Sequence, residues 1–375
     1  MPHHKDALNK INEKLSIAEK LKTLHQVTQQ HHPFISRIAV VLYDSDTDLL
    51  KTFLYCGEDE NPLENYQAKL SDTTYLKKIL EASEPRVIND LTQLHDSQKR
   101  HTQALLDAGY LSSYTLPMIV NDHFFGFVFF NALEKDVFNE HVMIELDMVS
   151  HMITLLIYNE RANIRTLLAT VKSALNITHS RDPETASHLE RMSRYTRLIA
   201  RTLAPKFNFD DQYIEHIYLF APLHDLGKIK VPDRILLKPD KLTSEEFSVM
   251  QSHPGDGREL IDLLLENYGL NGVGFVDMLR NITNYHHEYV DGSGYPEGLS
   301  GDQIPIEARI VTVADVFDAL TSERPYKKAW TNEQAYQKLQ EMSGKQFDPQ
   351  CVDALLNSKV EIEEIQRTFM ENDYG

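Results

Sequence analysis

The sequence predicts two domains, an α+β domain followed by an all-α domain, joined by one long helix. Strand-type apolar runs bounded by polar turns are confined to about residues 35–132. From about residue 139 to 177 no Pro or Gly interrupts a helical pattern, and after residue 179 apolar residues recur at helical spacing. A chain of 375 residues is also long for a single hydrophobic core.

Composition narrows the classes of function. Hydrophobic residues make up 42% of the chain and charged residues 25%, as in ordinary globular proteins. A formal net charge of -18 argues against binding to a nucleic-acid polymer, which requires a basic face. No apolar run reaches the roughly 18 residues of a membrane span, and the first residues lack a secretory signal. With Cys56 and Cys351 alone there is no disulfide framework, so we expect a cytoplasmic protein.

The first domain is expected to contain an antiparallel sheet with helices. The polar turn Asn121-Asp122-His123 lies between two strand-type runs and predicts a hairpin. The expected strands are Ile38–Tyr43, Leu50–Cys56, Ser113–Val120 and Phe124–Asn131, and the expected helices are Tyr75–Ala82 and Gln98–Ala108.

This order of elements, with the phrase Phe124-Phe125-Gly126-Phe127-Val128, resembles a GAF sensory domain; a PAS-like domain is the alternative. The resemblance implies a sensory domain at residues 23–138 that binds an unknown small molecule. An N-terminal helix or extension would occupy residues 1–22.

The connecting helix at 139–177 carries a seven-residue repeat. Ile157, Ile164 and Val171 form one register, and Ile153, Glu160, Leu167 and Ala174 form its companion. Such a repeat is typical of a coiled coil, which favours a parallel homodimer. The alternative is a long helix that packs on its own domain.

The second domain is expected to be helical throughout. Its predicted helices are Leu189–Leu203, Tyr213–Leu223, Ser244–Gln251, Gly257–Glu266, Val273–His287, Ile306–Ser322 and Asn332–Met342.

Short motifs in the second domain place acidic side chains among apolar residues. His224-Asp225 follows the apolar run 217–223, and Asp315 follows the run 310–314. A buried carboxylate needs a cation or several hydrogen bonds. From His286 onward, two adjacent histidines precede a loop that reads Gly-Tyr-Pro at 294–296. We interpret the set as a metal site; a buried hydrogen bond between the residues of the His224-Asp225 pair is the alternative for that motif.

Further candidate ligands complete this site. Glu184 and His188 are four residues apart, on one helix face, although such a pair is also common on surfaces. His253 lies between two predicted helices. Nitrogen and oxygen donors without thiolate suit iron or manganese better than structural zinc; we expect iron, with manganese as the alternative. Two ions would share Asp225, and Glu184 would permit a third.

Two metal ions in proteins acidify a bridging water and assist phosphoryl displacement. Lys228, one turn beyond Asp225, could contact a phosphate oxygen or protonate a leaving group. Arg324 and Lys327 follow Asp315 by about one helix length and could hold an anion.

In their order, these motifs resemble the HD-GYP family of metal-dependent phosphodiesterases over residues 181–353. The matching segments are Asp182-Pro183-Glu184-Thr185 with His188, then His224-Asp225-Leu226-Gly227-Lys228, His253-Pro254, the block from His286 to Pro305, Asp315, Asp318 and Arg324-Pro325-Tyr326. The resemblance implies a catalytic domain at 178–362 before an acidic tail at 363–375. It implies metal ligands at Glu184, His188, His224, Asp225, His253, His286, His287 and Asp315. It further implies catalysis by Asp225 and Lys228, and substrate contacts from Lys228, Tyr295, Asp318, Arg324 and Lys327.

The implied activity is hydrolysis of cyclic di-GMP to pGpG, and onward to GMP in some members, by a metal-bridged water under control of the sensory domain. One alternative is the same chemistry on cyclic GMP-AMP or on another phosphoester, as in the wider HD superfamily. The other is a cyclic-dinucleotide receptor with little turnover.

Overall fold

The computed structural model describes residues 6–94, 99–178, 186–268, 274–323 and 328–370, and these divide into two compact units. Unit 1 spans Met1–Ile164 and unit 2 spans Arg165–Gly375, so the division falls inside the connecting helix α4, Glu140–Thr178. The two-domain organisation and the connecting helix are confirmed, with an antiparallel sheet in unit 1 and an essentially helical unit 2.

Unit 1 is built on a six-stranded antiparallel sheet with the order β3-β2-β1-β6-β5-β4. The predicted hairpin is present, and Asn121 and Asp122 at its tip have positive φ values of 51° and 62°, as a tight two-residue turn requires. The strands are β1 Ile35–Asp44, β2 Leu49–Gly57, β3 Gln67–Lys69, β4 Arg86–Ile88, β5 Ser112–Val120 and β6 His123–Ala132.

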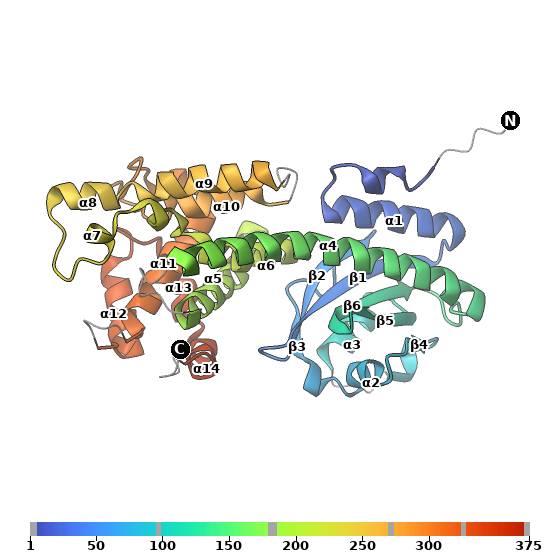
Figure 1. Ribbon diagram of the computed structural model, residues 1–375. Coiled ribbons are helices and arrows are strands. Elements are labelled where there is room, and N and C mark those ends of the chain that lie inside the picture. The colour runs from blue at the N-terminus through green and yellow to red at the C-terminus, as the bar shows by residue number, and fades with distance from the viewer. Residues whose placement is uncertain (1–5, 95–98, 179–185, 269–273, 324–327, 371–375) are drawn as a thin grey trace. The chain divides into compact units, whose positions relative to one another are not determined.

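Helices cover both faces of this sheet (Figure 1). One face packs on α1, Ile17–His31, and on the first half of α4. The other face is covered by α2, Thr74–Ala82, and α3, Arg100–Asp107, with the 3-10 turns η2, Leu70–Asp72, and η3, Leu91–Leu94. A further turn, η1, spans Asn9–Asn12. Helix α1 begins at a capping box between Ser16 and Glu19, so the predicted boundary at residue 22/23 falls inside a helix.

The start of the repeat on α4 packs within unit 1. Ile153 and Ile157 are 2% and 1% exposed and belong to the core beneath the sheet. These positions therefore do not form the expected seam between two copies of the chain, and the own-domain alternative is correct for them. Within the described residues, Glu140–Thr170 is the one helical stretch long and apolar enough to cross a membrane; length and composition alone are weak evidence of a span.

Unit 2 consists of helices joined by loops and short 3-10 turns. Most predicted helices are present, and Asn332–Met342 is reproduced to the residue as α12. The acidic tail expected from 363 begins inside a helix, because α14 continues to Thr368. The other elements are α5 Ala186–Phe207, α6 Asp211–Phe220, η4 Ala221–Leu223, η5 Leu226–Lys230, α7 Asp233–Leu236, α8 Ser244–Met250, α9 His253–Asn267, α10 Val276–Tyr285, η6 Gly301–Gln303, α11 Ile306–Thr321, α13 Pro349–Leu356 and α14 Lys359–Thr368.

Candidate metal centre

Unit 2 gathers one carboxylate and three imidazoles around a single point. Asp225, His253, His286 and His287 each offer one ligand atom, and these atoms all lie within 4.8 Å of one another. Asp225 precedes η5, His253 is the first residue of α9, and the two adjacent histidines follow α10. Three segments that are distant in the sequence therefore converge on one site, as the motifs predicted.

A close backbone approach brings η5 against the start of α9. A Cβ atom on Gly227 would lie 1.8 Å from the carbonyl oxygen of His253, a distance that no side chain tolerates. Glycine at this position therefore lets Asp225 and His253 meet. Gly294 has a similar role in the loop after α10, where a Cβ would lie 2.3 Å from the backbone nitrogen of Tyr289.

The hydrogen bonds of the histidines select the ring nitrogen that faces the site. A carbonyl oxygen can only accept, so a neutral imidazole whose Nδ1 bonds to one carries its proton there and its lone pair on Nε2. This is the arrangement that a metal-ligating histidine adopts. The Nδ1–oxygen distances are 2.9 Å for His224 to Ala221, 2.7 Å for His253 to Met250, and 3.1 Å for His286 to both Ile282 and Thr283.

As a result, acceptor atoms face one another around Asp225. The Nε2 atoms of His253 and His286 are 3.3 Å apart, and Oδ1 of Asp225 lies 3.1 Å and 3.5 Å from them. Oδ1 is buried and accepts no hydrogen bond from the described residues. Acceptor atoms at these distances repel one another. A cation bound between them would attract each of them and offset this repulsion. The residues therefore fit a divalent metal ion.

The other oxygen of Asp225 faces a second set of donors. Nε2 of His224 lies 3.1 Å from Oδ2 of Asp225 and 4.0 Å from Oδ1 of Asp315. Nε2 of His188 lies 3.7 Å from the same Asp315 oxygen. Since each oxygen of Asp225 faces its own group of ligand atoms, the geometry suits two cations that share one carboxylate.

Charge and burial keep these groups in the protonation states that ligation requires. Burial lowers the pKa of His286 and lowers that of His287 well below its ordinary value, so both rings are neutral near pH 7. Burial alone would raise the pKa of Asp225, but the charge of Lys228 and the adjacent His224 hold it well below its usual range. Nζ of Lys228 lies 2.6 Å from Oδ2 of Asp225, which places the predicted catalytic lysine at the centre of the site.

Asp318 differs from its prediction. Its side chain has no exposed surface, so it does not contact a substrate as expected. Instead its Oδ2 lies 2.7 Å from Nδ1 of His188, and Arg191 donates to both of its oxygens at 2.7 Å and 3.0 Å. Ser322 donates a further hydrogen bond at 2.8 Å. Asp318 is therefore a positioning residue that orients the ring of His188 toward Asp315.

Glu288, which was not singled out from the sequence, shapes the loop after α10. Its carboxylate accepts hydrogen bonds from the backbone N–H groups of Glu297, Gly298 and Leu299, at 2.7, 3.1 and 3.0 Å. These bonds fold the loop back toward α10. Nothing in a single sequence distinguishes this carboxylate from a solvated one, because its partners are all backbone groups.

The folded loop lays Tyr295 beside the site. The centroids of the Tyr295 and His287 rings are 4.8 Å apart, and Phe247 of α8 meets Tyr295 edge-on at 6.4 Å. Phe247 is 46% exposed, so aromatic surface is open to a ligand next to the candidate metal ligands. Tyr295 thus lies beside His287, and its role as a substrate contact stays a prediction. The candidate ligand Glu184 and the candidate substrate contacts Arg324 and Lys327 lie outside the described residues.

Comparisons with known proteins agree with this geometry. Residues 179–351 match the HD domain family, so the C-terminal half of the chain carries an HD domain. The chain is 49% identical over 189 residues to the cyclic di-GMP phosphodiesterase response regulator RpfG of Xanthomonas campestris. The match covers 50% of this chain and 47% of that protein. The chain is 38% identical over 186 residues to 3'3'-cGAMP-specific phosphodiesterase 2 of Vibrio cholerae, covering 50% of this chain and 34% of that protein. The chain thus spans about half or less of the length of the curated relatives that it matches.

Solved structures resemble the N-terminal part. One is the GAF domain of a phosphoenolpyruvate-protein phosphotransferase from Coxiella burnetii, with 17% identity and a TM-score of 0.35, covering 42% of this chain and 90% of that one.

Proposed function

We propose that the chain is a metal-dependent phosphodiesterase that hydrolyses a cyclic dinucleotide, cyclic di-GMP in the first place. The observation that carries this proposal is the position of Asp225, whose two oxygens face two separate groups of nitrogen and oxygen ligands. Metal ions bound on both sides of a shared carboxylate supply an activated water and offset the charge of an in-line phosphoryl displacement. The names of the relatives support the same substrate class.

The proposed ligands are the two groups around Asp225, with His253, His286 and His287 on one side and His188, His224 and Asp315 on the other. Glu184 is proposed as the ligand of a third ion, from the resemblance alone. We propose iron as the metal, with manganese as the alternative, because nitrogen and oxygen donors without thiolate suit either ion.

The chain's own residues position and protonate the substrate in this proposal. The ammonium group of Lys228 lies beside Asp225, where it can donate to a phosphate oxygen or to the departing 3′ oxygen. Tyr295 and Phe247 offer aromatic surface on which a base can stack. Arg324 and Lys327 are proposed as further phosphate contacts. Stacking accepts any base, so it leaves cyclic GMP-AMP as the alternative substrate, which the name of one relative supports.

Two further parts of the proposal concern the rest of the chain. Unit 1 binds a small molecule that controls turnover, and the chain forms a homodimer. The core position of Ile157 leaves the outer face of α4 for a dimer contact, since Ile144, Met148 and Leu155 are 56%, 58% and 53% exposed. The cytoplasm as the place of action stays a prediction from the sequence.

The test uses the full chain, purified without oxygen and supplied with iron(II) or manganese(II). Cyclic di-GMP, cyclic GMP-AMP and a nucleoside monophosphate are offered separately, and products are resolved by chromatography. We expect pGpG or GMP from cyclic di-GMP, and hydrolysis slower by about a thousandfold or more with the Asp225→Asn variant. Release of phosphate from the monophosphate, with both cyclic dinucleotides intact, would contradict the proposal.

A further inference from the structure

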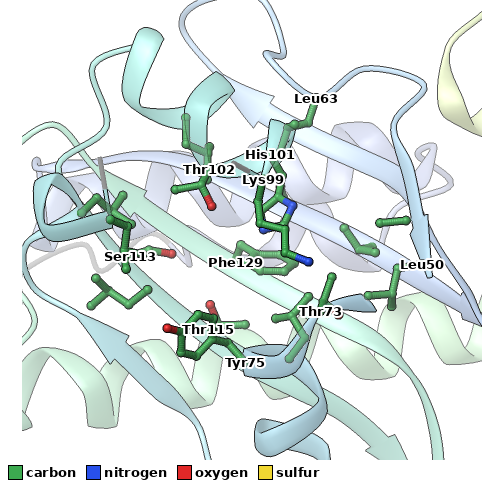
Figure 2. A pocket seen from close by; sticks show the side chains of 18 of the residues that line it. Leu50, Leu63, Thr73, Tyr75, Lys99, His101, Thr102, Ser113, Thr115 and Phe129 are labelled. Carbon is green, nitrogen blue, oxygen red and sulfur yellow. The ribbon is translucent and has the colours of Figure 1, made fainter. Parts of the chain in front are cut away.

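Unit 1 contains a cavity of about 400 Å³ on the sheet face that α2 and α3 cover (Figure 2). Its size lies in the range of small-molecule sites. All six strands contribute to its walls, together with α2, α3 and η3. Figure 2 shows Lys99, His101, Thr73 and Thr115 around the cavity, with Phe129 among them.

Most of the wall is apolar and would accept a hydrocarbon body. Aliphatic side chains line the cavity from several elements, and Tyr66 and Tyr75 add aromatic surface. Hydroxyl groups of Thr52, Thr115 and Ser113 provide neutral hydrogen-bonding positions on the sheet. A ligand here would bury apolar atoms against the wall, as is usual for small-molecule sites.

Among the residues that the structure describes, the charged side chains of this wall all have one sign. Arg37, Arg86 and Lys99 line the cavity, and none of its lining residues within the described part of the chain is Asp or Glu. This contrasts with a chain whose formal net charge is -18. Cations gathered in a mostly apolar wall favour an anion, since a low-dielectric setting strengthens the attraction.

Arg37 carries its charge deep in the protein with no acidic partner among the described residues. It is 2% exposed, and its terminal nitrogens donate to the neutral amides of Asn131 at 2.7 Å and Asn61 at 3.2 Å. No carboxylate of the described residues pairs with it; the rings of Tyr55 and Tyr110 lie 5.6 and 6.0 Å from its guanidinium carbon. Burial lowers the pKa of Arg37 to about 10, so it remains charged at neutral pH.

Arg86 offers the more accessible guanidinium. It is half-buried on the edge strand β4, and its guanidinium carbon lies 4.1 Å from the centroid of the Tyr75 ring. Stacking covers one face of the group and leaves the forked N–H edge for a ligand. Within the described residues Arg86, like Arg37, has no carboxylate partner.

We propose that this cavity binds a small organic acid, a single carboxylate on an aromatic or branched aliphatic body, with the carboxylate paired to Arg86. Arg37 and Lys99 strengthen the binding through their charge. A carboxylate suits the site better than a phosphate, because the apolar wall penalises a second, strongly hydrated charge. The inference deepens the proposal that unit 1 binds a small molecule, and it does not depend on hydrolysis in unit 2.

Isothermal titration calorimetry on the full chain tests this inference directly, with binding as the readout. The probes are 2-naphthoate and 4-methylpentanoate, each beside its neutral amide, and 2-naphthyl phosphate. We expect at least one acid to bind and its amide to bind about tenfold more weakly or worse, since a charge-assisted hydrogen bond is lost. The Arg86→Gln substitution should weaken binding of the acid by a similar factor. Lys78→Gln is the control, because it removes a positive charge from an exposed position on α2 outside the cavity. The affinity for the acid should not change in this variant.

A second variant, Ala68→Phe, fills the cavity from the edge strand β3 without altering a cation, and it should abolish binding of the acid. Equal affinity for acid and amide, tighter binding of the naphthyl phosphate, or acid binding that survives both Arg86→Gln and Ala68→Phe would overturn the inference. Failure of both acids to bind would overturn it as well. A chain that binds the acid but hydrolyses no cyclic dinucleotide would refute the proposed function alone.

Discussion

The candidate metal centre of unit 2 and the cavity of unit 1 each gather groups whose charge is not compensated by the described residues, and the two charges have opposite sign. Around Asp225, lone pairs from His253 and His286 point at a carboxylate oxygen. In the cavity, Arg37 and Arg86 lack a carboxylate partner among the described residues. A folded protein rarely leaves like partial charges together without compensation. The sign of the uncompensated charge therefore indicates the class of ligand, a cation in unit 2 and an anion in unit 1.

The largest expected effect comes from removing the anionic centre of the metal site. Asp225→Asn keeps the shape of the side chain but deletes the charge that two ions would share. Metal-bound charge supplies several kcal/mol of transition-state stabilisation, so hydrolysis of cyclic di-GMP should fall about a thousandfold or more. Circular dichroism should show an unchanged helical content. Near wild-type turnover with a reduced metal content would break the account of this site.

A smaller loss is expected when only the orientation of a ligand changes. Asp318→Asn retains the volume but weakens the hydrogen bond to Nδ1 of His188, so metal affinity and turnover should fall about 10- to 100-fold. Ser322→Ala is the matched control, because Ser322 bonds to Asp318 but does not touch the imidazole. Metal titration and kcat measured on both variants separate the two cases. Equal losses in both would mean that Asp318 acts through the stability of the helix pair.

Substrate stacking should have a more modest effect. Phe247→Ala removes an aromatic ring beside Tyr295 without touching a ligand atom. Because stacking on one base contributes about 1–3 kcal/mol, KM for cyclic di-GMP should rise about tenfold while kcat and metal content stay near wild type. Leu263→Ala, a change at an exposed apolar position on α9, serves as the control. A fall in kcat with an unchanged KM would rule out a stacking role for Phe247.

The smallest effect concerns stability and pH. Burial raises the pKa of Glu160 in α4 to about 7, and the charges of Lys20 and Arg161 offset only part of this shift. A carboxylate with a raised folded-state pKa stabilises the fold below its unfolded pKa, and this contribution is lost as the pH rises through about 7. Glu160→Gln should therefore stabilise unit 1 at pH 8 by about 1–3 kcal/mol, and little at pH 4. Urea unfolding at both pH values measures this, and an equal change at the two would contradict it.

Much of the fold could be predicted because local signals agree with tertiary packing. The Asn121-Asp122 turn identified a hairpin, and the regular pattern after Thr331, whose side chain caps α12, fixed that helix. An N-terminal helix or extension was expected only as far as residue 22, whereas α1 runs to His31; its start was readable, since Ser16 and Glu19 form a capping box three residues apart. Positions such as Ile157 were ambiguous for a physical reason. An apolar repeat looks the same whether it faces its own sheet or a second chain.

In the candidate site, too, some features could be read from the sequence and others depend on tertiary packing. The ligand motifs were readable because charged residues in apolar runs need partners. The role of Asp318 was not, because it lies on α11 three residues after Asp315, within the span of one turn. Which of the two faces the ligands depends on Arg191, a residue 127 positions away that binds Asp318. Only the packing of α5 against α11 shows that Asp315 is the candidate ligand and that Asp318 positions His188.

Elemental analysis of metal per chain, on protein purified without oxygen, tests the central claim most directly. Wild type and Asp225→Asn are measured in parallel, each before and after treatment with a chelator, and hydrolysis of cyclic di-GMP is followed in the same samples. The account predicts two or three divalent ions per wild-type chain, fewer in the variant, and activity that rises and falls with the metal. A wild-type chain that binds no metal, or that hydrolyses the dinucleotide equally well after complete chelation, would contradict it.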